Sequence, residues 1–210
     1  QKHVANQTSL LASAFLYSDA KILDLGSGCG FVADSIATIK NLNNSNTIGP
    51  VMRLADNPSW NSPSKIIPPS HDKAHGHQQQ NFSIYELDLS FQMLQNRNNP
   101  TIQCDIENLC FKAASFDLVI SSFALQWIIN LEKTFNEIYQ ILKPNSFFIF
   151  SIPTYESLTE LRLASVKSGC NFYFNDLPKT SELKFHLEKA GFNLRNIKQE
   201  TIKQEFTSAV

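Results

Sequence analysis

The sequence predicts an α/β fold, a doubly wound and mostly parallel sheet that is covered by helices on both faces. Short apolar runs alternate along the chain with segments of helical periodicity, which is the order expected of a parallel sheet. The first run, residues 22–25, leads directly into alternating glycines. With 210 residues, 42% of them hydrophobic, the chain can bury one core, so we expect a single domain over residues 1–210.

The expected strands are apolar runs that end in a small or acidic residue. In an open α/β sheet the ligand crevice lies outside the carboxyl ends of the strands, so these terminal residues are candidates for the site. After the strand at residues 22–25, the sequence predicts strands over residues 82–87, 101–104, 116–121 and 147–152, and a sixth near 193–197.

Helical spacing predicts the connections between the strands. Residues 31–40 follow the glycines as a helix, a short helix falls at 91–95, and another runs over 181–190. A core-facing amphipathic helix is predicted from apolar residues that recur every three or four positions, at Leu131, Phe135, Ile138, Tyr139 and Leu142.

The pair Pro144-Asn145 is predicted to stop this amphipathic helix. Proline cannot continue the helical hydrogen bonds, and asparagine is the best substitute for glycine where a left-handed turn is required. We therefore expect a positive φ at Asn145.

Residues 41–81 are polar, rich in Asn, Gln and Pro, and show no periodicity. The segment is too long for an ordinary connection, so we expect a flexible surface insertion. It contains residues whose side chains commonly coordinate metal ions, namely His71, Asp72, His75 and His77. A mobile loop lacks the surrounding hydrogen bonds that orient metal ligands, so we expect no metal site there.

The net charge and the spacing of the cysteines restrict which binding partners and which cellular compartment we expect. A net charge of −1 provides no basic patch for nucleic acid, and the apolar runs are too short to span a bilayer, so we expect neither partner. The four cysteines lack C-x-x-C spacing and fit reduced thiols, which favours a cytoplasmic location. Cys29, between two glycines, is either a nucleophile or a small residue in a crowded turn, and the second interpretation is favoured.

The turn Gly26-Ser27-Gly28-Cys29-Gly30 has G-x-G-x-G spacing and precedes a predicted helix. Glycine tolerates positive φ and lets the backbone approach a ligand, and the helix start offers free N–H groups. A nucleotide-like ligand is the natural occupant, although packing alone also produces such turns.

Two acidic residues strengthen the case for a nucleotide. Asp88 ends the second strand, where a carboxylate can accept hydrogen bonds from both ribose hydroxyls of an adenosine ligand. Asp105 ends the third strand, where it could accept the adenine amino group while the Ile106 N–H reaches a ring nitrogen. Each acid alone is also typical of a turn or cap, but glycines and then two acids at three successive strand ends indicate an adenosine site.

These motifs resemble those of class I S-adenosylmethionine-dependent methyltransferases. The likeness lies in residues 22–30, 86–90, 93–94, 105–109 and 116–121, and residues 142–145 resemble the family's Leu-Lys-Pro-Gly-Gly turn, with Asn145 and Ser146 replacing its glycines. Methyl transfer to a carboxylate needs no metal and no catalytic acid or base, so we expect neither. The resemblance implies S-adenosylmethionine as cofactor, held by Asp24, Gly26, Gly28, Asp88, Leu89, Asp105, Ile106 and Ser121.

Within this class the chain is similar to malonyl-acyl-carrier-protein O-methyltransferase, an enzyme of biotin synthesis, through residues 121–127, Leu131 and residues 157–161. The similarity implies malonyl-acyl-carrier protein as partner. It also implies an acyl site bordered by Phe123, Gln126, Trp127 and Arg162. The alternatives are that Trp127 is a core aromatic and that Arg162 is a solvated surface residue.

Two other functions stay open. Methyltransferase-like assembly factors of respiratory complex I, which act on or bind a protein partner, share the features at Leu125, Trp127 and residues 160–162, although we expect His at the position of Gln126 in that group. A methyltransferase for another small carboxylic acid would have the same cofactor half. The resemblance also leads us to expect truncation at both ends, of an earlier helical segment and of a last antiparallel strand.

Overall fold

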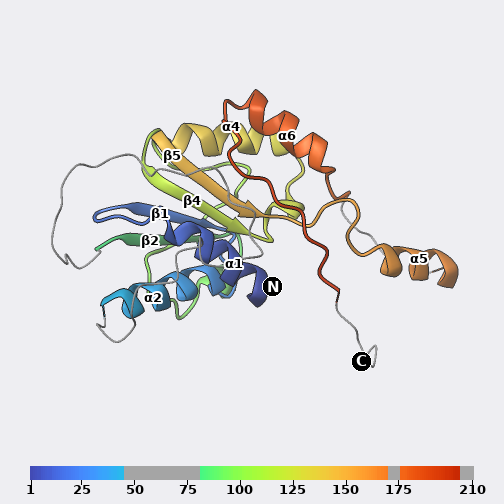
Figure 1. Ribbon diagram of the computed structural model, residues 1–210, viewed down its shortest axis with the longest axis horizontal. Helices are drawn as coiled ribbons and strands as arrows, with labels where there is room; N and C mark the ends of the chain where they lie inside the picture. The colour runs from blue at the N-terminus through green and yellow to red at the C-terminus, as the bar shows by residue number, and fades with distance from the viewer. Residues whose placement is uncertain (45–80, 170–175, 204–210) are drawn as a thin grey trace, which may run out of the picture.

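A five-stranded parallel sheet forms the centre of the computed structural model, which describes residues 1–44, 81–169 and 176–203 (Figure 1). Its order is β3-β2-β1-β4-β5, with every pair parallel. This order confirms the doubly wound α/β fold. The strands are β1 (Lys21–Leu25), β2 (Ser83–Asp88), β3 (Thr101–Gln103), β4 (Phe116–Ser122) and β5 (Leu142–Ser151).

Helices cover both faces of the sheet. Figure 1 shows α1 (Lys2–Ser13) and α2 (Phe31–Asn44) on one face, and α4 (Leu131–Ile141) and α6 (Thr180–Lys189) on the other. Side chains alternate between the faces of a strand, so β1 contributes to both cores. Ile22 joins the core beneath α1 and α2, whereas Leu23 and Leu25 join the core beneath α4 and α6.

The predicted amphipathic helix is confirmed as α4, and its ends have clear causes. The Asn130 side chain caps its first turn by accepting the Lys133 N–H at 3.0 Å, and Phe135 and Ile138 are fully buried. The predicted stop at Pro144-Asn145 is wrong: the helix ends at Ile141, three residues before Pro144, and both Pro144 and Asn145 lie within β5. Asn145 has the expected left-handed conformation, with φ of 63°.

The expected sixth strand near residues 193–197 is wrong. Those residues form no strand in the described part of the chain, and most of their side chains are exposed. A strand needs a hydrogen-bonding neighbour, and among the described residues β5 pairs only with β4. The local pattern of residues 193–197 therefore did not decide their structure.

Three short elements lie outside the main layers: α3 (Phe91–Leu94), a 3₁₀ turn over Leu125–Trp127, and α5 (Thr159–Ser168). The short helix at 91–95 is thus confirmed, whereas α1 and α5 were not predicted. The buried face of α1 consists of small residues, Ala5, Thr8, Ser9 and Ala12, which give little hydrophobic periodicity.

Most of the expected insertion at 41–81, including the candidate ligands His71, Asp72, His75 and His77, lies outside the described residues. Among residues 1–44, 81–169 and 176–203, no group of three His, Cys, Asp or Glu could hold a metal ion. In the same ranges, every helix is too short or too polar to span a bilayer.

Candidate cofactor and acceptor site

The glycine turn after β1 lies against the turns that follow β3 and β4. Gly26 has a φ of 67°, and a Cβ at this position would overlap Ala124 and lie 3.3 Å from the Cδ1 atom of Ile106. The next residue is tied to β2, because the Ser27 N–H donates to the Leu87 carbonyl at 2.9 Å. The carboxyl ends of β1, β2, β3 and β4 therefore converge at one place, as the sequence predicted.

Asp88 is in contact with the glycine turn. Its Oδ2 atom accepts the Gly28 N–H at 2.9 Å, and its Oδ1 atom accepts the Ser90 N–H at 2.8 Å. An ionised carboxylate has about four lone-pair positions, so both oxygens can still accept hydroxyl groups. Asp88 thus both shapes the turn and presents an acceptor beside it.

Asp105 organises a tight turn after β3. Its Oδ1 atom accepts the Glu107 N–H at 2.9 Å, and its Oδ2 atom lies 3.3 Å from the Asn108 amide nitrogen. A carboxylate acceptor at this strand end is expected both if Asp105 only stabilises the turn and if it binds adenine. Ile106, the next residue, is buried, and with Ala124 it is one of the residues that a Cβ at Gly26 would meet.

Asp24 is fully buried at the end of β1. Within the described part of the chain, neither of its carboxylate oxygens has a hydrogen-bond partner, and the nearby Ser27 hydroxyl also lacks one. Burial, and then the neighbouring carboxylate of Glu86, raise the pKa of Asp24 to about 8. The charge of Arg97 and the backbone N–H of Ala33 oppose this rise, and a cationic ligand beside Asp24 would add to them and favour its ionised form.

Arg97 is a site residue that the sequence reasoning missed. Its Nε atom lies 2.7 Å from Glu86, which is fully buried on β2, and its Nη2 atom lies 2.8 Å from Asp34 on α2. The same guanidinium donates to the carbonyls of Cys29 and Gly30 at 3.2 and 3.3 Å. Arg97 therefore holds the glycine turn to both the sheet and the helix. Glu86 within an apolar strand is the signal that a cation must lie nearby.

Two further predicted cofactor residues lie at the same edge. Ser121 is fully buried, and its hydroxyl donates to the Leu25 carbonyl at 3.0 Å, which ties β4 to the start of the glycine turn. Leu89 follows Asp88 and is 65% exposed, so it offers an apolar surface that a bound ring could cover. We assign Ser121 to support of the turn and Leu89 to ligand contact, both as proposals.

The predicted acyl-site residues after β4 form one turn. Phe123 has a φ of 52°, which is rare for an aromatic residue and is typical of functional sites. Its N–H donates to the Ser151 carbonyl at 3.0 Å, and its carbonyl accepts the Gln126 side chain at 2.7 Å. Trp127 is 69% exposed, which excludes the alternative that it is a core aromatic.

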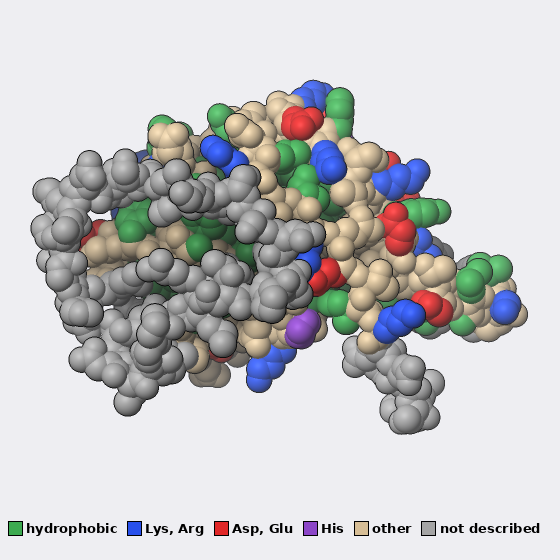
Figure 2. Space-filling view, viewed as in Figure 1, with side chains coloured by type: hydrophobic (Ala, Val, Ile, Leu, Met, Phe, Trp, Pro, Cys, Tyr) green, Lys and Arg blue, Asp and Glu red, His purple; other side chains and the backbone are tan. Residues whose placement is uncertain are grey.

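Arg162 lies apart from this turn. It belongs to α5, which projects away from the sheet and has no buried residue (Figure 1). Its guanidinium lies 5.2 Å from the centre of the Tyr155 ring. Figure 2 shows hydrophobic side chains on the surface at this end of the molecule, where Leu161, Leu163 and Val166 are exposed. The structure therefore brings together Phe123, Gln126 and Trp127, whereas it places Arg162 on a separate element.

Comparison with known proteins agrees with this architecture. Residues 73–150 match the family model described as a methyltransferase domain. A protein from Bacillus halodurans assigned as a methyltransferase has a TM-score of 0.60 at 16% identity, over 91% of this chain and 70% of that one. A Haemonchus contortus N-methyltransferase in complex with S-adenosylhomocysteine has a TM-score of 0.56 at 18% identity, over 89% and 37% of the two chains. At these identities the structures establish the fold.

The sequence relatives are of two kinds. Arginine-hydroxylase NDUFAF5, mitochondrial, from Danio rerio is 36% identical over 125 residues, which cover 54% of this chain and 39% of the relative. Malonyl-acyl-carrier-protein O-methyltransferase from Methylovorus sp. is 37% identical over 89 residues, which cover 42% of this chain and 30% of the relative. The chain thus spans less than half the length of either relative.

Fold and matching domain agree. Residues 73–150 match the methyltransferase domain model, and solved methyltransferases share the fold of this chain. Among particular proteins, the sequence is similar both to the malonyl-acyl-carrier-protein O-methyltransferase and to the NDUFAF5 arginine hydroxylases.

Proposed function

We propose that this protein transfers the methyl group of S-adenosylmethionine to the free carboxylate of malonyl-acyl-carrier protein. The convergence of three strand ends on one turn carries the proposal. Asp88 binds the Gly28 N–H at 2.9 Å, and Ile106, beside Asp105, lies against Gly26. Asp88, and Ile106 beside Asp105, thus lie at the glycine turn, which is where the proposal puts the adenosyl group.

Each cofactor residue has a proposed part in binding. Asp88 accepts the ribose hydroxyls, and Asp105 with the Ile106 N–H accepts and donates hydrogen bonds at the adenine edge. Leu89 covers the ring system. Asp24, buried and without a hydrogen-bond partner in the described ranges, lies where a cationic group of the cofactor would stabilise its carboxylate.

The proposed reaction requires few functional groups from the protein. Bound S-adenosylmethionine would supply an electrophilic methyl group, and the acceptor would be a carboxylate that is already ionised at neutral pH. No proton moves, so no catalytic acid or base is required. The protein must align the three reacting atoms and exclude the water that would solvate the carboxylate. We assign this task to the turn of Phe123, Gln126 and Trp127.

The choice of acceptor is supported by sequence similarity and by one structural feature. The Methylovorus relative is named for malonyl-acyl-carrier protein. Trp127 is 69% exposed and follows directly after the turn that packs on Gly26, where an acyl chain would reach the cofactor. Arg162 would reach the malonyl carboxylate only if α5 approached this turn on binding. A carrier protein as partner and a cytoplasmic location both stay predictions.

The decisive assay uses methyl-labelled S-adenosylmethionine with the full-length protein. Malonyl-acyl-carrier protein should become labelled, whereas acetyl-acyl-carrier protein, which lacks the free carboxylate, should not. A protein that binds the cofactor but labels neither carrier would contradict the proposed acceptor.

An activity on a protein arginine is the second candidate. The longer of the two matches, 125 residues at 36% identity, is to a Danio rerio protein named as an arginine hydroxylase. In that case the turn of Phe123, Gln126 and Trp127 would bind a segment of a protein chain in place of an acyl group. Cofactor binding without methyl-ester formation, together with a mass increase on an arginine-containing partner, would favour this second function.

A further inference from the structure

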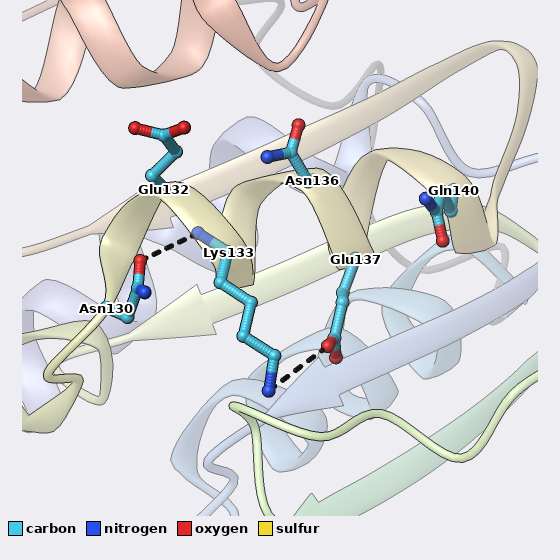
Figure 3. A pocket seen from close by; sticks show the side chains of 6 residues that line it. All are labelled: Asn130, Glu132, Lys133, Asn136, Glu137 and Gln140. Atoms are coloured by element: carbon cyan, nitrogen blue, oxygen red, sulfur yellow. Dashed lines mark hydrogen bonds and ion pairs between the residues drawn. The ribbon is translucent and has the colours of Figure 1, made fainter.

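Helix α4 holds the Asp105 turn from outside the cofactor site. The Leu109 N–H donates to Glu137 at 2.7 Å, and the Lys133 ammonium donates to the Glu107 carbonyl at 2.6 Å. Figure 3 shows Lys133 and Glu137 pointing to the same side of α4, away from Glu132, and joined by an ion pair of 3.6 Å. The turn that carries the proposed adenine contacts is thus fixed by Lys133 and Glu137, whose contacts with it span 26 and 28 positions of the chain.

One of these contacts continues toward the site. The Lys133 ammonium also donates to the Asn108 Oδ1 atom at 2.6 Å. An ammonium can only donate hydrogen bonds, so it requires the oxygen of the Asn108 amide to face it. The amide nitrogen must then face the other way, where it lies 3.3 Å from the Asp105 Oδ2 atom. Lys133 therefore fixes the orientation of the Asn108 side chain.

The orientation of Asn108 matters for Asp105. With its nitrogen toward Asp105, the amide donates a hydrogen bond to the Oδ2 atom and holds the carboxylate in place. With the amide reversed, two oxygens would face each other, and the carboxylate would turn away. An acceptor at this position binds the 6-amino group of adenine and repels the 6-oxo group of hypoxanthine, while the Ile106 N–H opposes the N1–H of hypoxanthine.

We propose that Lys133 is a positioning residue for base recognition: through Asn108 it fixes the Asp105 carboxylate as the acceptor that selects a 6-aminopurine. The proposal rests on the proposed placement of adenine at Asp105. It makes cofactor selectivity depend on a half-exposed lysine of α4 that does not itself contact the ligand.

The test compares two probes, S-adenosylhomocysteine and its deaminated analogue S-inosylhomocysteine, by titration calorimetry. Replacing Lys133→Met should weaken binding of the adenosyl probe by about fivefold, the effect of one partly solvated hydrogen bond. The preference of this variant for the adenosyl probe over the inosyl probe should fall by a similar factor. Lys133→Arg should retain most of the preference, because a guanidinium can still donate to Asn108.

Lys189→Met is the matched control. Lys189 is a half-exposed lysine that binds Glu132 of α4 at 2.8 Å, so its loss removes an ion pair of the same helix without touching the Asp105 turn. The control should keep the wild-type preference. An unchanged preference in Lys133→Met, or an equal loss in Lys189→Met, would overturn the inference. A wild-type protein that binds neither probe would instead refute the cofactor assignment itself, and the inference with it.

Discussion

Arg97 binds the buried carboxylate of Glu86 at 2.7 Å, while its guanidinium fills the space that a side chain at residue 30 would need. A single cation thus neutralises a fully buried acid on β2 and fixes the last glycine of the turn. The Gly30 conformation, with φ of 75°, follows from the same arrangement. Stability of the sheet and shape of the cofactor site are therefore linked at this residue.

Gly30→Ala should destabilise the protein more than the backbone strain alone explains. A Cβ at residue 30 would overlap the Arg97 guanidinium, so Arg97 must move from Glu86. Gly169→Ala is the control, since Gly169 has a similar φ of 67° but no atom of the described residues within 4 Å of a Cβ. We expect the control to lose about 1 kcal/mol and Gly30→Ala about 2–4 kcal/mol in urea unfolding. Equal losses would show that Arg97 does not restrict this position.

Arg97→Met should cost about 3–5 kcal/mol of unfolding free energy, because it removes the cation that pairs with the buried Glu86 and leaves it, among the described side chains, with the hydrogen bond from Asn99. The double variant Arg97→Met with Glu86→Gln should recover part of this loss, since the buried group is then neutral. Chemical denaturation of the three proteins measures both effects. An Arg97→Met variant whose unfolding free energy lies within about 1 kcal/mol of the wild-type value would contradict the role assigned to Arg97.

Asp24→Asn should stabilise the protein at neutral pH while weakening cofactor binding. Burial raises the pKa of Asp24 from 3.8 to about 8 in the folded chain. The stability that its protonated form provides is fully present below pH 3.8 and is lost as the pH rises through about 8. Asparagine does not ionise, so at pH 8 the variant should be more stable by about 1 kcal/mol or more, with no difference near pH 4.

The same variant should bind S-adenosylhomocysteine more weakly, by about 1–3 kcal/mol, because the carboxylate partner of the ligand ammonium is gone. Calorimetry and thermal unfolding from pH 4 to 8 check the two effects together. A variant that gains stability and keeps full affinity would show that Asp24 is not a cofactor contact.

The contribution of Asp117 to stability should depend on pH in the opposite direction to that of Asp24. Burial disfavours its charge, but hydrogen bonds from Lys143, the Lys21 N–H and Tyr17 outweigh burial and lower the pKa of Asp117. Its contribution is present above the unfolded pKa of 3.8 and is lost as the pH falls through the lower folded value. Asp117→Asn should therefore lose about 1–3 kcal/mol at pH 7 and progressively less below pH 4. Asp19→Asn, an exposed acid near Lys21, should show little change at either pH.

The parallel sheet and the convergence at the glycine turn were predictable because they depend on local patterns. Apolar runs that end in glycine or aspartate fix the strands, and parallel strands place their carboxyl ends at one edge. Asp88 and Ile106 accordingly lie beside the turn that contains Gly26 and Gly28.

What sequence reasoning missed depends on contacts between distant residues. Arg97 looks like a loop residue until Glu86 is recognised as a buried acid that needs a cation. Lys133 looks like the solvated face of a helix, since its link to Asn108 exists only in the folded chain. The false strand at 193–197 has suitable residues but no pairing neighbour among the described strands.

Calorimetry with S-adenosylhomocysteine on the wild type and on Asp88→Ala addresses the adenosyl site most directly. The wild type should bind, and the variant should lose about 1–3 kcal/mol of binding free energy, because the ribose hydroxyls lose a charged acceptor. Wild-type protein without measurable affinity, or a variant that binds as tightly as the wild type, would contradict the placement of the cofactor at this edge of the sheet.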